Sequence, residues 1–260
     1  MAGPGEQITS REAAASDQRV SAAQFLLLLH SLPGLGEKAL GELLARIAKA
    51  RIEPTEFLRL GRNVLQSEFE LDGRTVSSLA ENISSLLASA RESARLLADY
   101  NVQVLSSAGA RYPRVLETFD AAPPAILYCR GWMDLLDCGE ESGRFRFTVA
   151  VSNGAGAAAL NAQDEIAADL ISVGGVPVTG HDRVAYQRLA LCAQRVGRPA
   201  LYVMDRGLRD ALGPEFNRPP FAAARIRTAQ FDTTQDLAIS PFKLDAHCLG
   251  GSNRRRDDLI

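Results

Sequence analysis

The sequence predicts an α/β protein in which a helical N-terminal domain precedes a Rossmann-like, three-layer α/β/α domain with a parallel sheet. Apolar residues recur at helical spacing through most of the first hundred residues, and strand-like and helix-like segments alternate after Phe145. A chain of 260 residues is also long enough for two domains of about 150 residues each. We expect a disordered lead-in at residues 1–20, a helical domain at 21–105, a linker with an extended segment at 106–144, and the Rossmann-like domain at 145–260.

The first domain opens with two predicted helices on either side of a glycine turn. Their apolar residues recur at helical spacing: Phe25, Leu28 and Leu29, then Leu40, Leu43, Leu44 and Ile47. In a helix-hairpin-helix, such a turn lets the backbone N–H groups of Gly34 and Gly36 approach a DNA phosphate, because no Cβ is in the way. An ordinary pair of helices joined by a short turn fits the same residues, and this second interpretation is favoured.

The rest of the first half is predicted from periodicity. Residues 54–65 are expected to form one short helix, and residues 76–98 an amphipathic helix with an apolar stripe. Asn101–Leu105 is predicted to be a strand. A proline-rich extended segment then leads to a second strand at Ala125–Cys129.

After Phe145 the chain alternates between strands and helices, as expected for a parallel sheet. The expected strands are Phe147–Val151, Val176–Thr179 and Pro199–Met204. The expected helices are Ala157–Ser172 and Asp182–Arg195. The apolar residues expected to face inward on the first of these helices are Leu160, Ile166, Ala167 and Leu170.

Composition excludes several classes of protein. The net charge of −2 argues against a globally basic nucleic-acid binder, although a local arginine cluster is enough to bind phosphate. The longest apolar run, Phe25–Leu29, is far shorter than the roughly 20 residues of a membrane span, and the N-terminus lacks a signal-peptide layout. We therefore expect a cytoplasmic protein that does not contact membranes. The four cysteines form no Cys-x-x-Cys pair, so no metal site is expected.

A Gly-x-Gly-x-x-Ala motif occupies Gly154–Ala159, between a predicted strand and a predicted helix. Glycines in this position allow phosphate to bind at the helix N-terminus. The dinucleotide fingerprint also requires an acidic residue at the end of the second strand, and Asp182 comes too late for that role. A tight turn without a ligand is therefore favoured, and no cofactor is expected.

Two polar sequences remain to be interpreted. His181-Asp182 fits a metal site or a general base, but no partner completes either, so Asp182 is expected to cap the following helix. Asn253 and the arginines Arg254, Arg255 and Arg256 follow a glycine pair and have the donors to grip phosphates. A solvated charge run explains them equally well. No catalytic residue is identified, and an enzyme is not expected.

Taken together, these residues resemble the DprA/Smf family of DNA-processing proteins. The resemblance rests first on Leu32–Gly36, the Tyr112-Pro113 segment and the run Pro123–Tyr128. It continues with Gly207-Leu208 after the third strand and Ile239–Phe242. The family's Arg-Asn-Arg element corresponds to Asn253-Arg254 or to Arg254–Arg256. The sequence departs from the family after the first and second strands of the Rossmann-like domain, where Val151–Gly154 and Thr179–Tyr186 keep little of the usual motifs.

The resemblance implies a single-stranded DNA-binding accessory protein of natural transformation and DNA recombination. RecA is then a partner that the protein helps to load, and a homodimer is implied. DNA contacts are expected from Asn253, Arg254, Arg255 and Arg256, with the N–H groups of Gly154 and Gly156, and more weakly from Gly34 and Gly36. The family continues beyond the point that corresponds to Ile260, so the second domain is expected to be incomplete at its C-terminus. Two alternatives stay open: a nucleotide-binding Rossmann sensor or enzyme, and a divergent member that has lost DNA binding.

Overall fold

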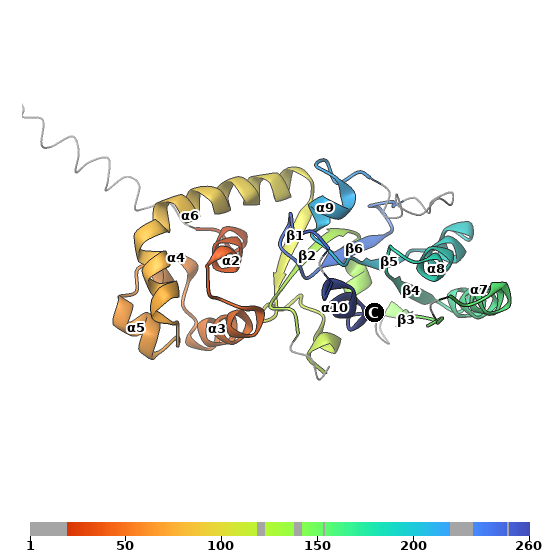
Figure 1. Ribbon diagram of the computed structural model, residues 1–260, viewed down its shortest axis with the longest axis horizontal. Coiled ribbons are helices and arrows are strands. Elements are labelled where there is room, and N and C mark those ends of the chain that lie inside the picture. Colours follow the sequence, from red (N-terminus) through yellow and green to blue (C-terminus); the bar gives the residue numbers. More distant parts are fainter. Residues whose placement is uncertain (1–19, 119–122, 138–141, 153, 219–230, 249) are drawn as a thin grey trace, which may run out of the picture. The chain divides into compact units, whose positions relative to one another are not determined.

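The computed structural model describes residues 20–118, 123–137, 142–152, 154–218, 231–248 and 250–260. The chain forms two compact units, one of residues 1–35 and 46–94 and the other of residues 36–45 and 95–260. Figure 1 labels their helices and strands. Apart from Val20, the lead-in expected at residues 1–20 lies outside the described residues, as does Asn153. No helix in the described ranges is both long and apolar enough to cross a membrane.

The first unit is helical, as predicted. The N-terminal helices are α2 (Ala22–Ser31), α3 (Glu37–Ala50), α4 (Pro54–Phe57), α5 (Arg62–Ser67) and α6 (Gly73–Asp99). Helices α3 and α6 each continue into the second unit. The core contains Phe57, whose ring makes edge-to-face contacts with Phe25 at 5.4 Å and Phe69 at 5.1 Å between centroids.

The single helix expected at residues 54–65 is instead two helices, α4 and α5. Helix α4 ends at Phe57, and α5 begins after Gly61, which occupies its N-cap position. Periodicity missed this break, because a four-residue and a six-residue helix are each too short to show an apolar stripe.

The second unit is built on a six-stranded sheet with the order β1-β2-β6-β5-β4-β3. Its strands are β1 (Val102–Ser106), β2 (Ile126–Gly131), β3 (Phe145–Phe147), β4 (Gly175–Thr179), β5 (Leu201–Val203) and β6 (Leu237–Ser240). The pairs β3–β4, β4–β5 and β5–β6 are parallel, while β1–β2 and β2–β6 are antiparallel. The α/β fold class is thus confirmed, with a sheet that is mixed rather than wholly parallel.

The antiparallel part comes from a region that was expected to be a linker. Residues 106–144 contain β2, which pairs with both β1 and β6, and the short 3-10 helices η1 (Arg114–Thr118) and η2 (Met133–Leu136). Leu116, Met133 and Leu135 of these helices are buried against the sheet. The segment is therefore part of the core, and its prolines shape a lead-in to a central strand.

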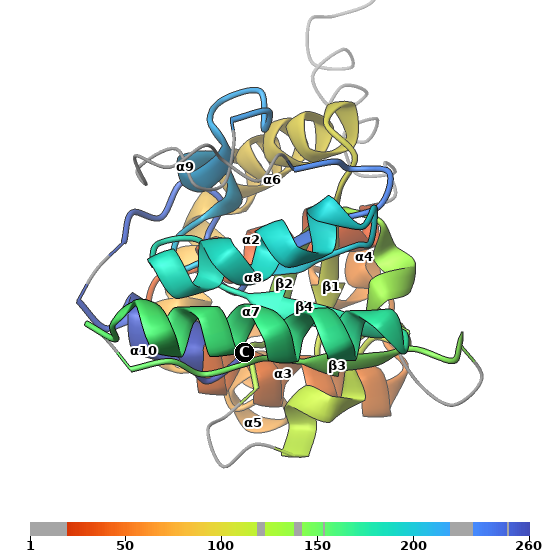
Figure 2. The same ribbon diagram turned by 90° about the vertical axis from the view of Figure 1, so that its right-hand side faces the viewer.

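The connecting helices α7 (Ala157–Ser172), α8 (Val184–Arg195) and α9 (Leu208–Leu212) follow β3, β4 and β5 in turn. Figure 2 shows α7 and α8 side by side over one face of the sheet, and both helices pack against β4. Helix α7 has the predicted bounds, but Ile166 is 49% exposed, whereas Gln163, Ala167 and Ile171 face inward. Of the four residues predicted to face inward, Ala167 is buried, Leu160 and Leu170 are half-buried, and Ile166 alone is exposed.

The other face of the sheet forms a second apolar layer. Val176, Val178, Leu201 and Ile239 contribute to it from three neighbouring strands, and η1, η2 and Leu259 cover them. Strand β3 is shorter than the expected Phe147–Val151, and it begins two residues earlier. Its pairing with β4 ends opposite Pro177, which has no N–H to donate.

The amino-terminal end of β6 is fastened by a buried carboxylate. Asp236 accepts backbone N–H bonds from Ala200 and Asp232, both at 2.9 Å, and its own carbonyl oxygen accepts the N–H of Trp132 at 2.8 Å. Burial raises the pKa of Asp236 to about 6, although the two N–H donors act in the opposite direction.

Candidate functional site: a charged network at the carboxyl edge of the sheet

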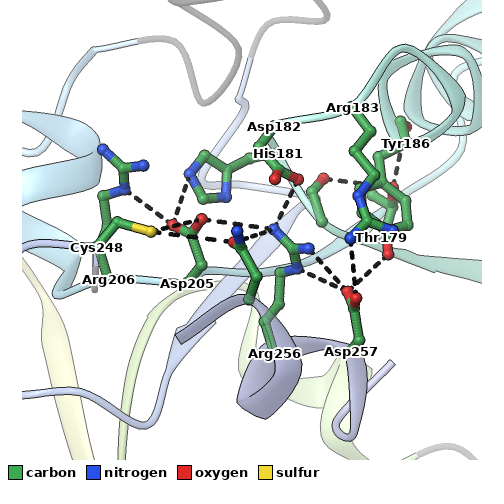
Figure 3. A network of polar contacts seen from close by, with 12 residues as sticks. Thr179, His181, Asp182, Arg183, Tyr186, Asp205, Arg206, Cys248, Arg256 and Asp257 are labelled. Carbon is green, nitrogen blue, oxygen red and sulfur yellow. Dashed lines mark hydrogen bonds and ion pairs between the residues drawn. The ribbon is translucent and has the colours of Figure 1, made fainter. Parts of the chain in front are cut away.

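The carboxyl ends of β4 and β5 carry the densest polar cluster described in the second unit. His181 and Asp182 follow β4, Asp205 follows β5, and Arg256 reaches them from α10 (Ser252–Asp257), as Figure 3 shows. In open α/β sheets this edge is where ligands usually bind. The cluster therefore stands where a functional site is expected.

Arg256 is the centre of the cluster, and its side chain is fully buried. One terminal nitrogen, Nη1, lies 2.6 Å from Asp182 and 3.5 Å from Asp205, while Nη2 lies 2.8 Å from Asp257. The guanidinium also packs 5.1 Å from the ring centroid of Tyr186. Burial alone lowers the pKa of Arg256, but the bonds to Asp257 and Asp182 outweigh it, so the net shift is upward. A buried cation of this kind is tolerable because three carboxylates surround it.

Asp205 links this arginine to His181. Its carboxylate is 1% exposed and lies 3.2 Å from His181 Nε2 and 2.8 Å from Arg206 Nε. Burial raises the pKa of Asp205. The hydrogen bonds from His181 and Arg206 together lower it by more than that, so the pKa of Asp205 lies well below its ordinary value. His181 is 7% exposed, and its second ring nitrogen, Nδ1, has no hydrogen-bond partner among the described residues. Asp205 is therefore held as a carboxylate at neutral pH.

Asp257 closes the other side of the network. It accepts bonds from the Tyr186 hydroxyl at 2.8 Å and from Arg183 at 3.0 Å. Gly180 makes this close packing feasible, because a Cβ there would lie 2.7 Å from the Tyr186 ring and 3.1 Å from Arg256 Cδ. The network ties α10 to the segment between β4 and α8 through side chains on both.

The predicted arginines have different surroundings, although they are adjacent in sequence. Arg254 is exposed. Arg255 lies 3.0 Å from a carboxylate oxygen of Glu37, and its side chain is mostly buried. Asn253 accepts a bond from Arg256 at 3.3 Å, so it belongs to the network. Arg254 therefore offers the freest guanidinium of the triplet.

The glycine turn before α7 is not part of the network in Figure 3. Gly154 has φ +78°, and Gly156 is the N-cap of α7 without a side-chain capping bond. A Cβ at either glycine would meet no described atom within 4 Å. The turn is thus open, as a site for a phosphate has to be.

The two weaker glycine candidates, Gly34 and Gly36, differ in how much space surrounds them. Gly34 has φ +85°, and a Cβ there would lie 3.1 Å from Thr75 Oγ1 and 3.3 Å from Asp72 Oδ2. Gly34 therefore serves internal packing, and the Asp72 carboxylate beside it repels phosphate. A Cβ at Gly36 would have no described atom within 4 Å.

The expected capping role of Asp182 is wrong. Helix α8 begins at Val184 with Arg183 as its N-cap, and no side chain caps it. The carboxylate of Asp182 pairs with Arg256 instead. Sequence reasoning also missed Asp205, Tyr186 and Asp257. For Asp205 a signal was present, because it is the first charged residue after the buried run Leu201–Met204, which places it at the carboxyl edge.

The structure of DNA processing protein A (DprA) from Streptococcus pneumoniae is similar with a TM-score of 0.61 and 15% identity, over 93% of this chain and 75% of that one. DprA from Helicobacter pylori, studied for its unique single-stranded DNA binding mode, aligns with a TM-score of 0.46 and 18% identity, over 61% and 64% of the two chains. No family model and no curated protein sequence matches.

The likeness to the Streptococcus pneumoniae protein extends through both units, since it spans nearly the whole chain. The family resemblance predicted from short motifs is therefore confirmed at the level of the fold, and the chain has the fold of DNA processing protein A.

Proposed function

We propose that this protein is a single-stranded DNA-binding accessory protein, not an enzyme, that acts in the processing of DNA during uptake and recombination. The observation that carries the proposal is the DprA fold over 93% of the chain. The motifs that resemble the family, from Leu32–Gly36 to the arginines of α10, support it independently.

The residues of α10 have two different roles in this proposal: some contact phosphate, and others hold the helix in place. Arg254 is exposed and contacts phosphate, and Arg255 joins it when it exchanges Glu37 for a phosphate oxygen. Arg256 and Asn253 hold α10 in place, because the guanidinium of Arg256 is already surrounded by carboxylates. The open turn at Gly154 and Gly156 supplies backbone N–H groups at the start of α7.

Partners and cellular setting follow from the resemblance. RecA is proposed as a protein partner that is loaded onto the bound strand, with a homodimer as the acting form and the cytoplasm as its location. Co-purification of RecA with the DNA-bound protein, but not with the DNA alone at the same salt, tests the first of these.

The experiment for DNA binding is fluorescence anisotropy with a labelled poly-dT strand over a series of salt concentrations. We expect the affinity to fall with salt, and Arg254→Ala to reduce the slope of log K against log[salt] by about 0.7 for one lost phosphate contact. Arg198→Ala is the matched control, since Arg198 is exposed in the turn before β5, away from α10.

The outcomes of this experiment decide between the candidate functions. Equal slopes for wild type, Arg254→Ala and Arg198→Ala would remove Arg254 from the interface. A folded protein that binds no poly-dT at low salt would overturn the proposal. In that event, thermal stabilisation by a nucleotide would identify a Rossmann-type sensor, and no response would identify a member that has lost DNA binding.

A further inference from the structure

A cavity of about 230 Å³ lies on the face of the sheet opposite α7 and α8. Val178, Leu201 and Ile239 line it from three adjacent strands, and Leu116 and Leu259 line it together with Ile260, the residue that follows Leu259. All of these except Ile260 are buried. Val115, which is 45% exposed, also lines it, so the cavity is walled by core residues and reachable from solvent.

This cavity is large enough for a small apolar group. A dry cavity of about 150 Å³ lined by Leu, Ile and Phe binds benzene. By that measure the cavity admits one aromatic ring or an alkyl chain of roughly six carbons.

An arginine is placed among these apolar walls. Arg146 lies on β3 opposite Val176 of β4, so it faces the same side of the sheet as Val176 and Val178. Its side chain lines the cavity together with Thr148. Within the described ranges, no ion pair of Arg146 is formed. A cation and a hydroxyl group thus sit beside an apolar space, which is the usual composition of a small-ligand site.

We propose that this cavity binds a small carboxylate with an apolar body, such as a short alkanoate or an aryl acetate. The apolar body occupies the space above Val178, Leu201 and Ile239, and the carboxylate pairs with the guanidinium of Arg146. Thr148 can donate a hydrogen bond to the same carboxylate. The two residues proposed to hold the carboxylate, Arg146 and Thr148, lie outside α10, and the site does not depend on the DNA-binding proposal.

The test uses three probes that separate the apolar body from the charge: hexanoate, hexan-1-ol and acetate. Binding to the full chain is followed by NMR through the methyl groups of Val178, Leu201 and Ile239. We expect hexanoate to shift these methyls and to bind about fivefold more tightly than hexan-1-ol, as for one accessible ion pair. Acetate, which lacks the apolar body, is expected to cause no shift.

Two variants test the assignment. Arg146→Gln is expected to keep the fold, since Arg146 makes no ion pair within the described ranges, and to bind hexanoate and hexan-1-ol equally. Arg195→Gln, at the end of α8, is expected to keep the preference. Val115→Phe, at the accessible side of the cavity, is expected to weaken both ligands. Equal affinity of the wild type for hexanoate and hexan-1-ol, or an unchanged preference in Arg146→Gln, would overturn the carboxylate site, and absence of methyl shifts with all probes would overturn the cavity as a binding site.

Discussion

The α10 network and the turn before α7 were both expected to contact phosphate, yet they are built in opposite ways. In the network, the guanidinium of Arg256 is buried and forms ion pairs with the carboxylates of Asp182, Asp205 and Asp257. In the turn, no described atom lies within 4 Å of where a Cβ of residue 154 or 156 would be, and no charged residue occurs between Ser152 and Ala159 in the sequence. The network around Arg256 therefore holds α10 in place, whereas the turn before α7 leaves its backbone N–H groups accessible to a phosphate.

The comparison shows that a residue type suited to phosphate does not by itself identify a phosphate contact. An arginine that is saturated by carboxylates positions other residues, because any phosphate has to displace a paired anion first. Backbone N–H groups at an open helix start need no displacement.

Arg256→Met is expected to lower the free energy of unfolding by about 3 kcal/mol, because it removes the guanidinium shared by Asp182, Asp205 and Asp257. Urea unfolding followed by circular dichroism measures the loss. Arg254→Met, on the exposed side of the same helix, is expected to change stability by less than about 0.5 kcal/mol. Similar values for the two variants would show that the network does not fasten α10.

Asp205→Asn is expected to cost about 2 kcal/mol at pH 7, since the carboxylate accepts bonds from Arg206 and His181. The pKa of Asp205 is depressed in the folded protein, so its contribution is present above the unfolded value of about 3.9 and is lost as the pH falls through and below it. The difference between variant and wild type should therefore shrink between about pH 5 and pH 3. A constant difference across that range would contradict a charge-based role.

Gly154→Ala is expected to lower stability by about 1 kcal/mol, because φ +78° is costly for a residue with a Cβ. Gly154→Asn is the matched control, since asparagine tolerates this conformation better and should lose less. Thermal unfolding of both variants at one pH gives the comparison. An alanine variant as stable as the wild type would mean that the turn adjusts its backbone.

Gly156→Ser and Gly156→Asp are expected to raise stability by only a few tenths of a kcal/mol, as each supplies the missing N-cap oxygen of α7. The two differ in charge, which makes poly-dT affinity the informative measurement. If the start of α7 contacts phosphate, Asp weakens binding and Ser does not. Equal affinity of both variants would leave α10 as the DNA contact.

Periodicity predicted the elements that are long and regular, and it failed where tertiary contacts decide. Helix α7 has its predicted bounds because sixteen residues carry a clear pattern between two glycine turns. Strand β3 was misplaced, because Val149–Val151 has strand composition but pairs with no strand among the described residues, where the β3–β4 pairing ends at Pro177. Sequence alone also could not separate Arg254 from Arg256, because the difference depends on Asp182 and Asp205, which lie far away along the chain.

Asp236 and Asp205 affect the pH dependence of folding stability in opposite ways. Its folded pKa of about 6 lies above the unfolded value of about 3.9, so the folded state takes up a proton first as the pH falls, and protonation favours folding. Acidification from pH 7 thus removes the cost of the buried charge on Asp236 before it neutralises Asp205 at the carboxyl edge. The combined contribution of these two carboxylates to stability is expected to be greatest in mild acid, where the first is neutral and the second is still charged.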